Sequence, residues 1–171
     1  LAEGERALHL SPGNENAASL LASLYSRVNR GADARRVVGQ ALKLTPDSID
    51  LHVIMAQLDY TASDLSGAEE QLSAVIKLEP AVLGHRFRLA QFYVLNGEVN
   101  AAERTLREAI ASHPDDVQAK LALADLIAAH RSFDEAEKSL KLLIAENGSS
   151  LPLRLGLGEF YASHGKLDQA E

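Results

Sequence analysis

The sequence predicts an all-α protein, a right-handed α-solenoid of stacked antiparallel helix hairpins without β-strands. Ala and Leu dominate the composition, Trp is absent and aromatic residues make up only 5% of the chain, which favours helix over sheet. Prolines and alanines recur every 34 residues, as in helical repeat arrays. Within each period, apolar residues lie three or four positions apart, which is typical of amphipathic helices.

Positions 34 residues apart form columns, and two columns fix the period independently. They are Pro12, Pro46, Pro80 and Pro114, followed by Gly148, and Ala34, Ala68, Ala102, Ala136 and Ala170. Proline lacks an amide hydrogen and disfavours helical geometry in the residue before it. The proline column therefore marks the end of each hairpin. We expect the alanine column to lie where the two helices of a hairpin approach closely, because a larger side chain would hold them apart.

These columns divide the chain into one continuous array of repeats. Residues 1–14 are predicted to be the second helix of a truncated repeat. Full repeats follow at 15–48, 49–82, 83–116 and 117–150, and residues 151–171 form another truncated repeat. First helices are expected at about 15–28, 49–62, 83–96, 117–130 and 151–164. Second helices are expected at about 33–45, 66–79, 100–112 and 134–146.

The start of each second helix carries a recurring polar pattern. We expect N-caps at Ser66, Asn100, Asp134 and Asp168, each followed three residues later by Glu. The cap side chain can accept a hydrogen bond from an amide of the first turn, and the Glu can reach back to the amide of the cap. Ser66 with Glu69 matches this capping box best. The pair Asp115-Asp116, which follows Pro114, is expected to cap the first helix after it.

A single hairpin of this size cannot bury both of its faces, so stability must come from stacking against neighbouring hairpins. The pattern predicts no polar capping helix at either end of the chain. We therefore expect the sequence to be part of a longer array, and we expect the open ends to allow end-to-end self-association.

These columns resemble the tetratricopeptide repeat family, with its 34-residue helix-turn-helix unit, small residues at close contacts and terminal proline. The resemblance covers the whole chain. The family's aromatic column is kept at Tyr25, Tyr93 and Tyr161 but becomes Asp59 and Ile127 in the other repeats. The family's Trp column holds Ala18, His52, Arg86, Lys120 and Arg154. We expect that corner to be less buried, or covered by the aliphatic stems of long side chains.

The resemblance implies a non-enzymatic protein–protein interaction module or scaffold that binds a partner peptide or helix on the concave face, which the first helices line. The corresponding candidate residues are Asn16, Ser19, Ser23, Val53, Gln57, Phe87, Gln91, Leu121, Asp125, Leu155 and Glu159. Val53, Phe87, Leu121 and Leu155 form an apolar column beside side chains that can hydrogen-bond a peptide backbone. A second interpretation is that these apolar residues only fill the space between adjacent first helices.

Two functional alternatives follow. The chain can instead be a structural spacer or self-assembly segment of a larger protein, in the style of bacterial arrays that serve the envelope, pili or polysaccharide export.

Some family members clamp a carboxylate with Lys, Asn and Arg. The one plausible cation at the corresponding place is Arg88, and the columns themselves hold Ser19, Ser23, Val53, Gln57, Phe87 and Gln91. We therefore reject a carboxylate clamp.

Composition and motifs argue against other function classes. A net charge of −7 disfavours nucleic acid and anionic membranes, and no apolar run is long enough for direct membrane insertion. The sequence predicts no enzyme, cofactor or metal site. His130 and His164 have no second His or carboxylate three or four residues away within their own predicted helices, 117–130 and 151–164. The absence of cysteine leaves cytoplasm and periplasm both open.

Overall fold

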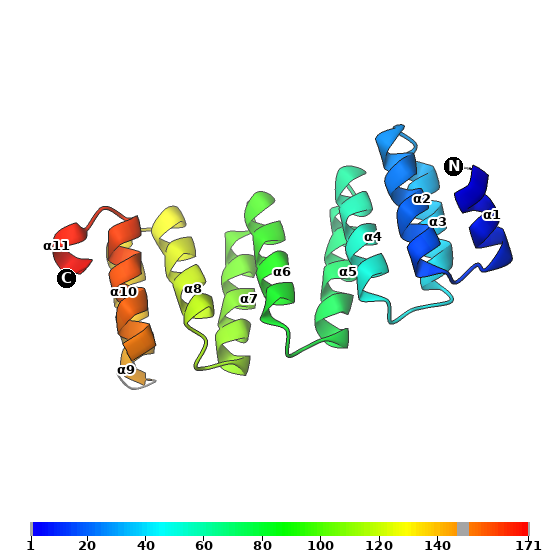
Figure 1. Ribbon diagram of the computed structural model, residues 1–171. Helices are drawn as coiled ribbons and strands as arrows, with labels where there is room; N and C mark the ends of the chain where they lie inside the picture. Colours follow the sequence, from blue (N-terminus) through cyan, green and yellow to red (C-terminus); the bar gives the residue numbers. More distant parts are fainter. Residues whose placement is uncertain (1, 147–150, 171) are drawn as a thin grey trace. The chain divides into compact units, whose positions relative to one another are not determined.

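The computed structural model describes residues 2–146 and 151–170, which form eleven α-helices and no strand (Figure 1). In order, they are α1 (Ala2–Leu10), α2 (Glu15–Arg27), α3 (Gly31–Leu42), α4 (Ile49–Thr61), α5 (Leu65–Leu78), α6 (Leu83–Leu95), α7 (Val99–Ser112), α8 (Val117–His130), α9 (Phe133–Glu146), α10 (Leu151–Ser163) and α11 (Leu167–Ala170). Gly148 lies outside the described residues.

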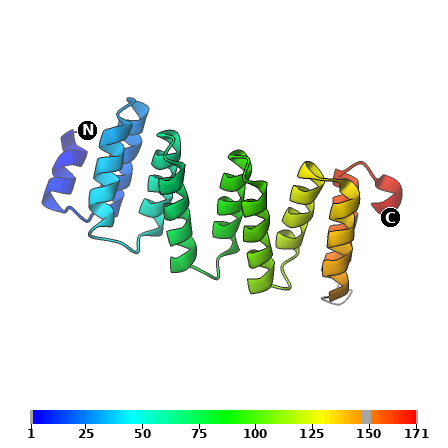
Figure 2. The ribbon, with the colours of Figure 1, turned by 180° about the vertical axis from the view of Figure 1, so that it is seen from behind.

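The chain forms two compact units, residues 1–85 and 86–171. In the first unit, α2 packs against α1 and α3, and α4 packs against α2, α3 and α5. In the second unit, α8 packs against α7, α9 and α10. Viewed from behind, α3 and α5 lie in front of α2 and α4 in the first unit (Figure 2). In these packed groups, α4 and α8 therefore each have their own second helix on one side and helices of a neighbouring hairpin beside them.

The predicted helices are confirmed. Every first helix begins at the predicted residue and ends within one residue of the predicted end. The largest difference is at α3, which begins at Gly31 and ends at Leu42, ahead of the predicted 33–45.

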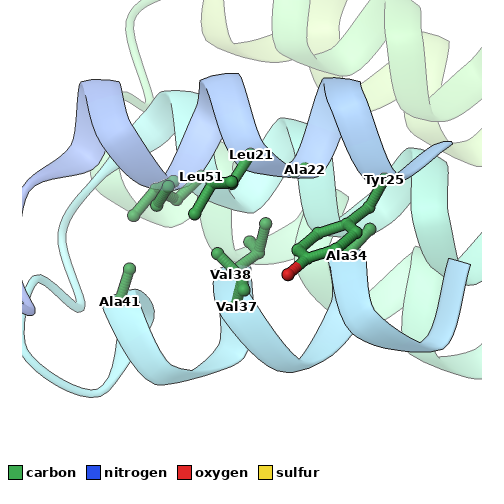
Figure 3. Packing of buried hydrophobic residues seen from close by; sticks show 9 residues of the cluster. Leu21, Ala22, Tyr25, Ala34, Val37, Val38, Ala41 and Leu51 are labelled. Atoms are coloured by element: carbon green, nitrogen blue, oxygen red, sulfur yellow. The ribbon is translucent and has the colours of Figure 1, made fainter. Parts of the chain in front are cut away.

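The alanine column lies at the hairpin contacts, as predicted. Ala34, Ala68, Ala102 and Ala136 are completely buried. In the first hairpin, Leu21, Ala22 and Tyr25 of α2 face Ala34, Val37, Val38 and Ala41 of α3, with Leu51 of α4 beside them (Figure 3). Burying one such Val or Leu side chain stabilises the fold by about 1.5–3 kcal/mol. These contacts are therefore a main source of hairpin stability.

The turn uses a residue with left-handed backbone geometry in four of the five hairpins, the exception being α8/α9, where Arg131 has a φ of −131°. Positive φ angles occur at Asn29 (57°), Ser63 (61°), Gly97 (75°) and Gly165 (72°), which share one column. The amide of the next residue donates to the carbonyl five residues back, as from Arg30 to Tyr25 at 2.8 Å and from Asp64 to Asp59 at 2.9 Å. This 6→1 bond closes the first helix, so the second helix begins at once.

The predicted capping boxes are wrong, because the second helices begin one residue before the expected caps. Asp64, not Ser66, caps α5, and its Oδ1 accepts a hydrogen bond from the amide of Gly67 at 3.0 Å. Ser132 caps α9, and its Oγ accepts a hydrogen bond from the amide of Glu135 at 3.2 Å. Asn100, Asp134 and Asp168 lie inside helices. Ahead of the first helices, Asp116 accepts from the amide of Ala119 as predicted.

Two of the glutamates assigned to those boxes bond toward the following first helix instead. Glu137 Oε1 accepts a hydrogen bond from the hydroxyl of Tyr161 at 2.6 Å and another from Lys141 at 2.8 Å. Glu103 forms ion pairs with Arg107 and with Arg131, the residue that follows α8. At these two positions the column therefore joins neighbouring hairpins rather than capping its own helix.

The corner that holds Trp in the family is not uniformly exposed. Ala18 and Lys120 are completely buried, so the expectation of weaker burial is wrong at these two positions. His52 is half-buried, with Nδ1 2.7 Å from Gln71 Oε1 and Nε2 2.9 Å from the carbonyl oxygen of Pro46. Arg154 is exposed. Each side chain therefore meets a different local environment at the same place in the repeat.

Candidate protein-binding surface

A cleft of about 620 Å³ lies in the first unit between α2, the start of α3 and α4. We call it the α2/α4 cleft. Its lining residues are Ser19, Ala22, Ser23, Ser26, Arg27, Asn29, Gly31, Ala32, Arg35, Ile54, Gln57, Leu58, Thr61 and Ala62. This set contains apolar side chains from α4, hydroxyl and amide groups from both first helices, and two arginines. No carboxylate is among these described lining residues.

Three of the predicted groove residues meet in this cleft. Ser19 and Ser23 contribute from α2, and Gln57 contributes from α4. Among the described residues, none of the three side chains has a hydrogen-bonding partner, whereas Ser26 and Thr61 donate to the carbonyls of their own helices. The three side chains are therefore available to a ligand. They lie beside Ile54 and Leu58, so polar and apolar recognition are combined in one place.

The other predicted residues of the first unit lie outside the cleft lining. Asn16 is exposed near the start of α2, and Val53 is half-buried on α4. Ile54 and Leu58, which sequence reasoning did not select, supply the apolar surface of the cleft instead. The helical period explains the difference, because a register shift of one residue turns a side chain by about 100° around the helix.

Arg35 was also missed, and it lines the cleft while holding two carboxylates. Its Nε lies 2.8 Å from Asp59 Oδ1, and its terminal nitrogen lies 2.7 Å from Asp64 Oδ2. Burial raises the pKa of the Asp59 carboxyl group, against the opposing charge of Arg35. The Gly67 amide and then Arg35 lower the pKa of Asp64. A sequence signal existed, because Arg35 interrupts a column that otherwise holds Glu, and Asp59 is a carboxylate in the aromatic column that Ile127 also interrupts.

Arg27 is the second cation of the cleft. It is the last residue of α2, it is exposed, and it makes no hydrogen bond or ion pair with another described residue. Because the charge of Arg35 is balanced by Asp59 and Asp64, Arg27 leaves the α2/α4 cleft with a positive charge that a ligand can meet.

In the second unit, the apolar column divides between packing and exposure. A β-carbon placed on Gly156 of α10 would lie 3.4 Å from the Leu121 side chain, so Leu121 packs against α10. Leu155 on α10 is 60% exposed. Phe87 is half-buried on α6, while Gln91 and Asp125 are exposed and Glu159 is exposed on α10. Leu121 therefore packs between first helices, whereas Leu155 is exposed.

The histidines do not form a metal-binding group. His130 is the last residue of α8 and is exposed, and His164 Nδ1 lies 2.8 Å from the carbonyl of Phe160. Across residues 2–146 and 151–170, we find no group of three or more His, Asp or Glu side chains placed to hold a metal ion. Within the same residues, no helix has the length and apolar character needed to cross a membrane.

The sequence profile of the tetratricopeptide repeat family matches residues 1–58 and 60–126. The chain belongs to the tetratricopeptide repeat family. This repeat is a protein–protein interaction module, and proteins built from it are typically non-enzymatic scaffolds. No curated protein matches the sequence.

Solved structures of tetratricopeptide repeat proteins share the fold. The chain is 16% identical to YrrB, described as a TPR protein with an unusual peptide-binding site, with a TM-score of 0.57 over 98% of this chain and 86% of YrrB. It is 19% identical to a repeat protein from Parabacteroides merdae, with a TM-score of 0.61 over 98% and 66% of the two chains. It is 24% identical to a thermophilic repeat protein from Thermus thermophilus, with a TM-score of 0.50 over 91% of this chain and 86% of that protein. These likenesses establish the helical solenoid fold.

Proposed function

We propose that the chain is a non-enzymatic binding module that holds a peptide segment or helix of a partner protein on the face of its first helices. The α2/α4 cleft would anchor that segment. The observation that carries the proposal is the meeting of Ser19, Ser23 and Gln57, all without partners among the described residues, beside Ile54 and Leu58. Such a surface can bury an aliphatic side chain while it hydrogen-bonds the backbone on either side.

Site-specific photo-crosslinking tests the proposal. A photoreactive amino acid replaces Ser23 in the cleft or, as the matched control, the exposed Ser66 on α5. In an extract of the source cells, the Ser23 probe should capture one partner segment in a saturable manner. The Ser66 probe should not capture that segment. Equal capture by the two probes would contradict the proposal.

A second candidate function is self-assembly, and the exposed leucines of the second unit favour it. Leu151 and Leu155 of α10 and Leu167 of α11 are all more than half exposed. Replacing Leu151 and Leu155 with Glu should then abolish any association seen in sedimentation velocity at rising protein concentration. Sedimentation of the unmodified chain as a monomer throughout would exclude this candidate.

A further inference from the structure

A second hollow in the first unit lies between α1 and α3, above α2. This α1/α3 crevice has a volume of about 630 Å³, and the buried side chains of Leu21 and Tyr25 on α2 form its floor. Leu8 of α1 and Val37 of α3 add apolar walls. The crevice belongs to the second helices, so it is separate from the surface proposed above.

One exposed leucine extends the apolar surface of the crevice. Leu44, which lines it just beyond α3, is 59% exposed. Leu10, at the end of α1 and in the same column, is 77% exposed and lies outside the lining. Large aliphatic side chains with that much exposure, next to a hollow, are typical of a surface that a partner covers.

The rim of the crevice is basic, although the whole chain carries a net charge of −7. Lys43 has no partner among the described residues, whereas Arg36 donates a hydrogen bond to Asp33 at 3.1 Å in an exposed ion pair, with its side chain 55% exposed. Glu5 is the one carboxylate among the described residues of the lining, and it accepts a hydrogen bond from the Tyr25 hydroxyl. The rim therefore attracts negative charge.

We propose that the α1/α3 crevice is a docking site for an acidic amphipathic segment of another protein. An apolar side chain of that segment enters between Leu8 and Leu44, and its carboxylates lie over Lys43 and Arg36. Charge complementarity selects acidic partners in preference to basic ones, and the apolar floor supplies contact area. This site makes no use of the α2/α4 cleft, so the two surfaces can be tested separately.

A titration followed by NMR tests this assignment. The isotope-labelled chain is mixed with a short synthetic peptide that carries Leu on one helical face and Glu on the other, or with its twin in which Lys replaces every Glu. The acidic peptide should produce saturable shifts at Leu8, Leu10 and Leu44, and these should weaken with added salt. The basic twin should leave the spectrum unchanged.

Charge reversal at two matched positions completes the test. Lys43→Glu should weaken binding of the acidic peptide by about tenfold. Lys77→Glu, at the equivalent exposed position one repeat later, should leave the affinity unchanged. The proposal is overturned by the absence of saturable binding, by equal weakening in both variants, or by shifts centred on Ser23 and Gln57. A circular dichroism melt of each variant confirms that the fold is intact.

Discussion

Arg35 of α3 and Asp59 of α4 form an ion pair at 2.8 Å at the positions that hold Glu137 and Tyr161 three repeats later. In the later pair, the Tyr161 hydroxyl donates to Glu137 at 2.6 Å. Both pairs join a second helix to the first helix of the next hairpin. Arg35 therefore stands where later repeats have Glu, Asp59 stands where the last repeat has Tyr, and the two changes together keep a bond between the helices.

This relationship predicts coupling between the two positions. Arg35→Glu alone places a third carboxylate beside Asp59 and Asp64 and should lower the free energy of unfolding by about 2–4 kcal/mol. The double variant Arg35→Glu with Asp59→Tyr recreates the pair found at Glu137 and Tyr161, so it should recover at least about 1 kcal/mol. Urea unfolding of the wild type, both single variants and the double variant measures this coupling. Additive effects would show that the pair is incidental.

Asp59 and Asp64 should give opposite pH dependence. Because the pKa of Asp59 is raised in the folded state, its stability contribution is present at low pH and is lost as the pH rises through the folded pKa. The pKa of Asp64 is lowered, so its contribution is present above the ordinary carboxyl value of about 4 and is lost as the pH falls.

Urea unfolding at several pH values checks these signs. As the pH falls from neutral, the stability of the wild type relative to Asp59→Asn should increase. Below about pH 4, its stability relative to Asp64→Asn should decrease. Parallel pH curves for the two comparisons would show that the two carboxyl groups share one environment.

Gly67 should resist replacement by Ala, although Ala is the better helix former by about 1 kcal/mol. A β-carbon there would lie 2.9 Å from Asp64 Oδ2 and 3.0 Å from Asp59 Oδ2, and Arg35 holds both carboxylates in place. We expect Gly67→Ala to destabilise the protein by about 1–2 kcal/mol. Gly84→Ala, early in α6 with no atom within 4 Å of the new β-carbon among the described residues, should be neutral or stabilising in the same thermal melts. If Gly67→Ala stabilised the protein as Gly84→Ala does, a β-carbon at position 67 would not be crowded by the two carboxylates.

Lys120 should limit the stability of the second unit. Its side chain is completely buried, and its Nζ makes no hydrogen bond in the described part of the chain. Lys120→Met keeps the volume and removes the buried amine, so it should raise the free energy of unfolding by about 1–3 kcal/mol. Lys138→Met on the surface of α9 should change it by less than about 0.5 kcal/mol. Destabilisation by Lys120→Met would mean that the amine has a favourable role.

Periodicity made the helices predictable, because Ala34 and its column have to fit the same contact in every hairpin. The cap at Asp64 was not predictable from Ser66 and Glu69, because the left-handed residue Ser63 makes the turn short and α5 begins at Leu65, one residue before the expected cap. The candidate site was predictable in part. Ser19, Ser23 and Gln57 follow from the repeat, whereas the neighbouring residues depend on how adjacent helices are turned.

Affinity for the partner segment identified by crosslinking tests the proposed binding module most directly. Calorimetry compares the wild type with Ser23→Tyr, which fills the α2/α4 cleft, and with Ser66→Tyr on the exposed surface of α5. We expect Ser23→Tyr to weaken binding by about tenfold or more and Ser66→Tyr to bind like the wild type, with all three melting alike. Unchanged affinity in Ser23→Tyr would contradict the assignment of the cleft as the docking site.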